Sequence, residues 1–134
     1  MVNISHRING KNNVVYVTVT GRLTGEDMIR YSTTIILEPA HRPGMDFITD
    51  ISEAEIDPSF EMLVRFHNHL KAYESELGKF RWAFIVGDHS NRKAAELYRS
   101  LSALSNGHIV EIFKVREEAE KWINSLQQQF FRSG

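Results

Sequence analysis

The chain has 134 residues, of which 42% are hydrophobic and 25% are charged, and its formal net charge is −1. This length and composition are typical of one folded domain, and they argue against a disordered chain, a basic nucleic-acid-binding surface and an acidic tail. The chain contains no cysteine, which excludes a disulfide framework, a thiolate metal site and a cysteine nucleophile.

The start of the chain and its hydropathy suggest a location. The first ten residues are polar and lack the apolar run of a signal peptide. No apolar run approaches the roughly 18 residues that span a bilayer. We therefore expect a cytoplasmic protein without a transmembrane segment. We also expect a single domain over residues 1–134, in which residues 127–134 are a candidate loose tail.

The first part of the chain predicts a hairpin followed by a helix. Residues 2–8 and 13–20 are extended runs joined at residues 9–10, an Asn-Gly dipeptide suited to a tight turn. Thr24 and Asp27 have the spacing of a helix capping box, and the helix is expected to end near residue 37.

The remainder alternates between strands and helices. Residues 46–51 predict a short strand, and the clearest helix of the chain runs from about residue 56 to 77. Its apolar stripe consists of Phe60, Leu63, Phe66, Leu70, Tyr73 and Leu77. Residues 82–86 form a continuous apolar run, typical of a central strand that is covered on both faces. A third helix over 94–104, a strand over 109–113 and a last helix over 119–126 complete the pattern.

The predicted order is β-β-α-β-α-β-α-β-α. Strands that are separated by helices need crossover connections and therefore tend to be parallel. The fold class is thus α/β, with a mixed, mostly parallel sheet of about five strands and four helices.

Ligands of open α/β sheets usually bind where the carboxyl ends of strands meet the following helices. Asp50 and Ser52, at the end of the third strand, are candidate contacts there. Asp57 and Ser59 come next, at the start of a helix. A phosphoryl group on Ser59 would lie in the positive end of the helix dipole, which favours a phosphorylation switch. Plain capping, with Asp57 as N-cap and a proline after it, explains the same residues without a function.

A second polar segment follows the buried strand at residues 82–86. Asp88, His89, Ser90 and Arg92 bring a carboxylate, an imidazole, a hydroxyl and a guanidinium together. They could bind an anion or contact a partner. Alternatively, Asp88 or Ser90 caps the next helix and the neighbouring side chains are simply solvated.

No metal site or cofactor is expected. The six histidines show no metal-ligand spacing, and His67 and His69 are two residues apart, so they point to different faces of a helix. Phosphate-binding loops and nucleophile elbows are absent from the sequence. Phe130 and Phe131, near the end of the chain, could cover the core edge or serve a homodimer contact.

Five segments, taken in order, resemble a known family. Residues 17–24 read VTVTGRLT, residues 46–52 read DFITDIS, residues 81–88 read RWAFIVGD, and VEIF at 110–113 precedes EEAEKWI at 117–123. Their order and spacing, from about Val14 to Leu126, resemble a STAS-like domain of the bacterial STAS/SEC14-like branch. The resemblance implies a sheet with helices packed largely on one side.

The resemblance also implies candidate functions. In the anti-sigma-factor antagonists of this family, a serine at the start of the second helix is phosphorylated by a partner kinase within an Asp-Ser-Ser-Gly motif. The matching stretch here, residues 57–60, reads DPSF, so Asp57 and Ser59 fit, whereas a proline and a phenylalanine replace the other two residues. SEC14-like relatives hold lipophilic molecules between sheet and helices. Such a cavity could use Phe60, Phe66, Trp82 and Phe84, although an ordinary packed core needs the same residues.

The leading hypothesis is a non-catalytic regulatory or protein-interaction module. Its contact surface would be the starts of the second and third helices, and its partner a kinase-like or anti-sigma-type regulator. The alternative is a carrier of a small lipophilic ligand. A small enzyme using Asp88 and His89 is the third hypothesis. It ranks last because no nucleophile with a matched base can be identified from spacing.

Overall fold

The computed structural model describes residues 2–56, 59–87, 91–103 and 108–133, and for residues 126–133 it describes the backbone alone. Five strands form one sheet in the order β1-β2-β3-β4-β5. The strands are β1 (Asn3–Asn9), β2 (Val14–Leu23), β3 (Asp46–Ile56), β4 (Phe80–Ile85) and β5 (His108–Phe113). The helices are α1 (Gly25–Ile36), α2 (Phe60–Lys71), the one-turn α3 (Glu74–Leu77), α4 (Asn91–Ser102) and α5 (Arg116–Ser133).

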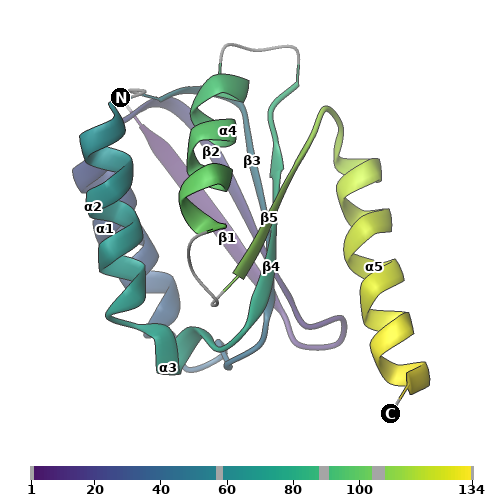
Figure 1. Ribbon diagram of the computed structural model, residues 1–134. Helices are drawn as coiled ribbons and strands as arrows, with labels where there is room; N and C mark the ends of the chain where they lie inside the picture. Colours follow the sequence, from purple (N-terminus) through teal and green to yellow (C-terminus); the bar gives the residue numbers. More distant parts are fainter. Residues whose placement is uncertain (1, 57–58, 88–90, 104–107, 134) are drawn as a thin grey trace.

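The predicted mixed sheet is confirmed. β1 pairs antiparallel with β2, and every other neighbouring pair is parallel. Each crossover from β2 to β5 moves one strand along the sheet in the same direction. Right-handed crossovers of this kind place their helices on one face, and α1, α2 and α4 indeed cover the same face (Figure 1).

The last helix packs on the opposite face of the sheet. No described strand follows α5, so no crossover dictates which face it covers. Its buried residues Ala119 and Ile123 pack against Ile48, Ala83 and Ile85 of the sheet (Figure 1). β4 is therefore covered on both faces, as its continuous apolar sequence predicts.

Of the two local predictions near the start of the chain, the helix capping box is confirmed and the tight hairpin turn is not. Thr24 and Asp27 form the predicted capping box: the Asp27 amide donates to Thr24 Oγ1, and the Thr24 amide donates to the Asp27 carboxylate, each at 3.2 Å. The hairpin turn is longer than the tight turn that the Asn-Gly pair predicts. Asn9 Oδ1 accepts from the Lys11 amide at 3.0 Å, and the positive φ of the connection, 63°, is at Asn13.

The predicted strand over residues 46–51 is too short, and the predicted long helix is too long. β3 continues to Ile56 because β2 pairs with it as far as Leu23, after a register shift between Thr18 and Thr20. The helix ends at Lys71, and the one-turn α3 leads toward the loop before β3, where the Gly44 amide donates to the Leu77 carbonyl at 2.8 Å.

Candidate functional site

The strands β3 and β4 are parallel, as predicted, and Ile85 at the carboxyl end of β4 pairs with Asp50 of β3. Asp50 Oδ1 accepts from both the amide and the hydroxyl of Ser52, at 2.9 and 2.6 Å, so these two candidates hold each other in place. A Cβ atom on Gly87, which follows β4, would lie 3.3 Å from Ser52 Cβ. The chain leaving β4 therefore passes directly over Ser52.

Asn91 holds this edge together, and the sequence analysis missed it. Its side chain is buried at the start of α4, where Nδ2 donates to the Ile51 and Ala54 carbonyls and Oδ1 accepts from the Ile56 amide. These bonds join the start of α4 to the last residues of β3, just before α2. The position of Asn91 at a helix start was the only signal in the sequence.

The other predicted residues at this edge have local roles or fall outside the described part. Ser59 is the N-cap of α2, and its hydroxyl accepts a hydrogen bond from the Met62 amide at 3.4 Å. The N-cap of this helix is therefore Ser59, whereas plain capping from the sequence expects Asp57. Arg92 pairs with Glu96 of its own helix at 3.1 Å. The remaining candidates, Asp57, Asp88, His89 and Ser90, lie outside the described residues, as do the side chains of Phe130 and Phe131.

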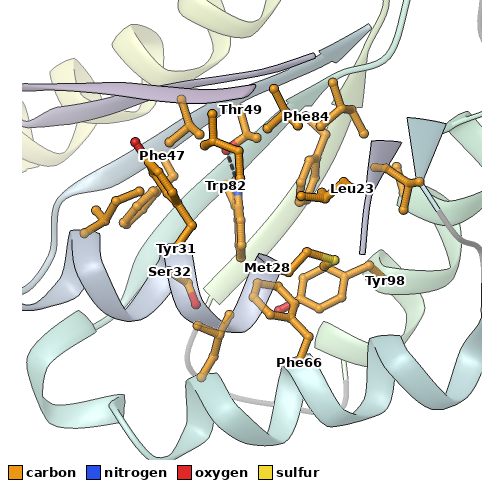
Figure 2. Close-up of a pocket in the computed structure, with 18 of the residues that line it drawn as sticks. Leu23, Met28, Tyr31, Ser32, Phe47, Thr49, Phe66, Trp82, Phe84 and Tyr98 are labelled. Atoms are coloured by element: carbon orange, nitrogen blue, oxygen red, sulfur yellow. Dashed lines mark hydrogen bonds between the residues drawn. The ribbon is translucent and has the colours of Figure 1, made fainter. Parts of the chain in front are cut away.

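A cavity of about 110 Å³ lies between the sheet and the layer formed by α1, α2 and α4 (Figure 2). Phe66, Trp82 and Phe84 line it, as the SEC14-like alternative predicts. Phe60 does not, because it begins α2 at the edge of the sheet, where 55% of its surface is exposed. The apolar stripe predicted for this helix is therefore wrong at its first residue.

The polar groups of the lining side chains are all hydrogen-bonded to the protein. Trp82 Nε1 donates to Thr49 Oγ1 at 2.9 Å, and Ser32 donates to the Ile29 carbonyl at 3.0 Å. The hydroxyl of Tyr31 bonds to His6 and that of Tyr98 to His108. Because these groups are already paired, the cavity offers a ligand an apolar interior.

The cavity reaches solvent along α1. Most lining residues are buried, and the half-buried ones are Ile4, Met28, Tyr31, Ser32 and Ile56. Met28, Tyr31 and Ser32 belong to α1, and Ile4 lies on the edge strand β1. We therefore place the mouth of the cavity along this helix.

α1 packs closely on α2 and is joined to the sheet by one hydrogen-bonded chain. A Cβ atom on Gly25 would collide with Met62 of α2, and His69 Nε2 of α2 bonds to Thr33 Oγ1 at 2.7 Å. On the other side, Tyr31 bonds to His6 Nδ1 on β1 at 2.6 Å, and His6 Nε2 bonds to Glu38 at 2.8 Å. Since a carboxylate only accepts hydrogen bonds, a neutral His6 donates from Nε2 to Glu38. Its Nδ1 then accepts a hydrogen bond from the Tyr31 hydroxyl.

An aromatic cluster closes the opposite end of the cavity. The ring of His108 stacks on Phe80, with centroids 4.8 Å apart, and its Nε2 lies 3.2 Å from the Tyr98 hydroxyl. Burial, together with neighbouring His67, lowers the pKa of His108 to about 4. Burial likewise lowers the pKa of His67, with a further contribution from Lys71. Both imidazoles are therefore neutral at pH 7.

The described residues hold neither a metal site nor a membrane span. No three histidine, aspartate or glutamate side chains among them gather closely enough to hold a metal ion. None of the described helices combines the length and the hydropathy that crossing a membrane requires.

Comparisons with known proteins identify the fold. No family model matches the sequence. No curated protein matches it either. Among solved structures, the chain is similar to an uncharacterised protein of the DUF3478 family with a SpoIIAA-like fold, from Shewanella loihica PV-4, with a TM-score of 0.60. The two share 18% identity over 91% of this chain and 93% of the other. The chain therefore has a SpoIIAA-like, that is STAS-like, fold, as its sequence motifs predict.

Proposed function

We propose that this SpoIIAA-like domain is a non-catalytic binding module that encloses a small apolar molecule between its sheet and its α1–α2–α4 layer. The cavity of about 110 Å³ carries the proposal. Protein interiors contain few voids larger than a water molecule, and an apolar cavity that stays empty costs stability. An apolar ligand that fills this space would recover the lost contacts.

The chemistry of the lining supports binding rather than catalysis. Among the residues that the structure describes, the nearest arrangement to a catalytic relay is the chain of Glu38, His6 and Tyr31. Burial raises the pKa of the Tyr31 phenol, and the negative charge of Glu38 raises it further. The phenol therefore stays protonated at neutral pH and is a poor nucleophile.

The test is native mass spectrometry of protein purified from cells. Ala95 lines the cavity, so Ala95→Leu fills part of it, whereas Ala103→Leu adds the same atoms at an exposed position just beyond α4. We expect the unmodified protein and Ala103→Leu to retain a small molecule, and Ala95→Leu to lose it. Absence of bound mass from the unmodified protein, together with no rise in Tm on addition of any apolar compound, would show that the cavity is not a binding site.

A second candidate function is the protein-interaction module predicted from the sequence. One observation favours it: Phe60, an exposed aromatic residue, lies next to Ser59 at the start of α2. Aromatic side chains are enriched in the cores of protein interfaces. A regulator that is controlled by phosphorylation of Ser59 would contact this edge.

Pull-down experiments with substituted protein would test this second function. Ser59→Asp retains a capping side chain while it mimics the added charge, and Phe60→Ala removes the exposed ring. Val115→Ala, at another exposed apolar residue, is the control. Loss of a kinase-like or anti-sigma-type partner with the first two variants alone would support the regulatory function. An unchanged set of partners in all three would rule it out.

A further inference from the structure

A second, smaller pocket lies where α2 and α3 meet the starts of β4 and β5. Its volume is about 20 Å³. A space of this size exceeds the roughly 10–15 Å³ that one water molecule needs. Unlike the apolar cavity, this pocket is lined in part by ionisable side chains. Its lining consists of His67, Leu70, Lys71, Glu74, Leu77, Gly78, Phe80 and His108.

His67 brings a buried nitrogen without a partner to this pocket. The residue is only 9% exposed, and no group in the described part of the chain forms a hydrogen bond with its Nδ1. A buried polar atom that lacks a partner destabilises the folded state, so such atoms are rare in native proteins. A small polar ligand in the pocket would supply the missing partner.

A second imidazole and an ammonium group lie beside His67. The ring of His108, on β5, has its centroid 6.0 Å from that of His67. Lys71 comes four residues after His67, so both side chains lie on the same face of α2. Within the described ranges, the Lys71 ammonium forms no ion pair. The pocket therefore combines two imidazoles with one unpaired positive charge.

The electrostatics of the pocket favour an anion over a metal ion. Burial lowers the pKa of His67, and the positive charge of Lys71 lowers it further. Glu74, the one carboxylate among the lining residues, has no part in the lowered pKa of either imidazole. Among the described residues, no third ligand completes a metal site with the two histidines. Lys71 would repel a metal ion, whereas it would attract an anion.

From this arrangement we infer a further binding site, in which His67, His108 and Lys71 hold a compact monovalent anion such as chloride or formate. The site is distinct from the apolar cavity, although Leu70 and Phe80 line both. The inference does not depend on the proposed function. A protonated imidazole donates hydrogen bonds from both of its nitrogens, so the anion would favour the charged form of the two rings.

Binding at this site should therefore tighten as the pH falls. An anion beside the rings raises the pKa of His67 and His108, and the protein then takes up a proton when the anion binds. The other ionisable groups that face the two rings are Lys71 and Glu74 from the α2–α3 side, and the Tyr98 hydroxyl from α4, 3.2 Å from His108 Nε2. Histidine is the side chain that ordinarily titrates near neutral pH, so the proton belongs to the imidazoles.

An NMR titration of the histidine rings tests the inference. Sodium chloride and sodium formate are the two probes, and sodium gluconate, whose anion is too large for the pocket, keeps the ionic strength constant. We expect saturable shifts of the His67 and His108 ring resonances with both small anions. We also expect tighter binding at pH 6 than at pH 8.

Three variants assign the effect to the pocket. Lys71→Gln removes the ammonium at an exposed position and should lower the affinity about twofold to fivefold. Lys93→Gln, exposed on α4, removes the same charge outside the lining and should leave the affinity unchanged. His67→Leu should abolish the response of the His108 ring to chloride. If this core variant does not fold, the comparison of the two lysine variants still decides.

Three results would overturn the inference. Equal shifts with gluconate would reveal a general effect of salt. Shifts of both rings with zinc ions, together with none from chloride or formate, would show a metal site instead. An equal loss of affinity in Lys71→Gln and Lys93→Gln would contradict the role of the pocket. Each of these results leaves the proposed binding of an apolar molecule in the cavity unaffected.

Discussion

At the scale of single residues, His108 is the side chain whose chemistry differs most from its ordinary behaviour. It stacks on Phe80 and approaches the hydroxyl of Tyr98, a phenol whose pKa burial raises far above its usual range. Protonation of His108 would place a charge among aromatic rings and beside His67, which is why its pKa falls to about 4. The folded protein therefore prefers His108 neutral.

This preference predicts a pH dependence of stability. In the unfolded chain the pKa of His108 is near the ordinary histidine value of 6.5, so between pH 6.5 and 4 the unfolded state binds the extra proton. The stabilisation that the folded state gains from neutral His108 is fully present above pH 6.5. It is lost as the pH falls toward 4, which lowers the free energy of unfolding by about 3 kcal/mol. Urea unfolding at a series of pH values measures it.

His108→Gln is the informative variant for that experiment, because glutamine keeps a hydrogen-bonding group near Tyr98 without titrating. We expect a flatter slope between pH 4 and 6.5 in this variant. Asn68→Gln, at an exposed position of α2, is the control and should retain the slope of the unmodified protein. An identical slope in His108→Gln and the unmodified protein would contradict the assignment.

At the scale of elements, α1 forms one wall of the cavity. It packs on α2, lines the cavity mouth with Met28 and Tyr31, and meets the edge strand β1 through the hydrogen bond between Tyr31 and His6. Glu38 completes this chain at the end of the helix. A ligand that enters along α1 has to pass between this helix and β1, so the chain should control the rate of exchange.

Tyr31→Phe tests the role of this chain because it removes one hydroxyl and keeps the ring. The variant leaves His6 Nδ1 without its partner, which should cost about 1 kcal/mol in the free energy of unfolding. Hydrogen exchange should accelerate at α1 amides and stay unchanged at α4. The dissociation rate of an apolar compound bound in the cavity, such as fluorobenzene, should rise as well.

Tyr16→Phe is the matched control for this experiment. The Tyr16 hydroxyl accepts from Asn12 on the opposite face of the sheet at 2.7 Å, so its loss should leave exchange at α1 unchanged. If both variants accelerate exchange at α1 equally, the chain of Tyr31, His6 and Glu38 is not a specific restraint on this helix.

At the scale of the whole molecule, the sheet separates two apolar cores with different properties. The core beneath α5 is small and includes the fully buried Ile123 and Ala119. The core beneath α1, α2 and α4 is larger and contains the cavity. Ligand binding should therefore depend on one face of the sheet, whereas stability should depend on both.

A pair of matched substitutions tests this division. Ile123→Ala removes buried methyl and methylene groups, so it should lower the free energy of unfolding by about 3 kcal/mol. It should leave the affinity of the cavity for an apolar compound such as fluorobenzene unchanged. Ile35→Ala, at a buried residue that lines the cavity, should change both quantities. Urea unfolding and ¹⁹F NMR titration provide the two measurements. A large loss of affinity in folded Ile123→Ala would show that the two faces are coupled.

Much of the architecture was predictable because its causes are local. The capping box of Thr24 and Asp27 involves residues three apart, and the apolar run around Trp82 indicates a central strand without reference to the rest of the chain. Strands that alternate with helices then favour parallel pairing, because each connection is long enough to cross over. These signals predict the mixed α/β sheet, and the resemblance of the sequence motifs adds the STAS-like fold.

The candidate site could not be predicted in the same way. It depends on how side chains from several elements fill a shared volume, and on contacts between residues that are far apart in the sequence. A buried aromatic sequence is compatible with a filled core or with a cavity. The difference is the volume left over after side chains from four strands and four helices have packed. Likewise, nothing near His6 in the sequence indicates Tyr31, and nothing near Asn91 indicates Ile51. Their bonds exist because the sheet and its crossovers bring distant segments together.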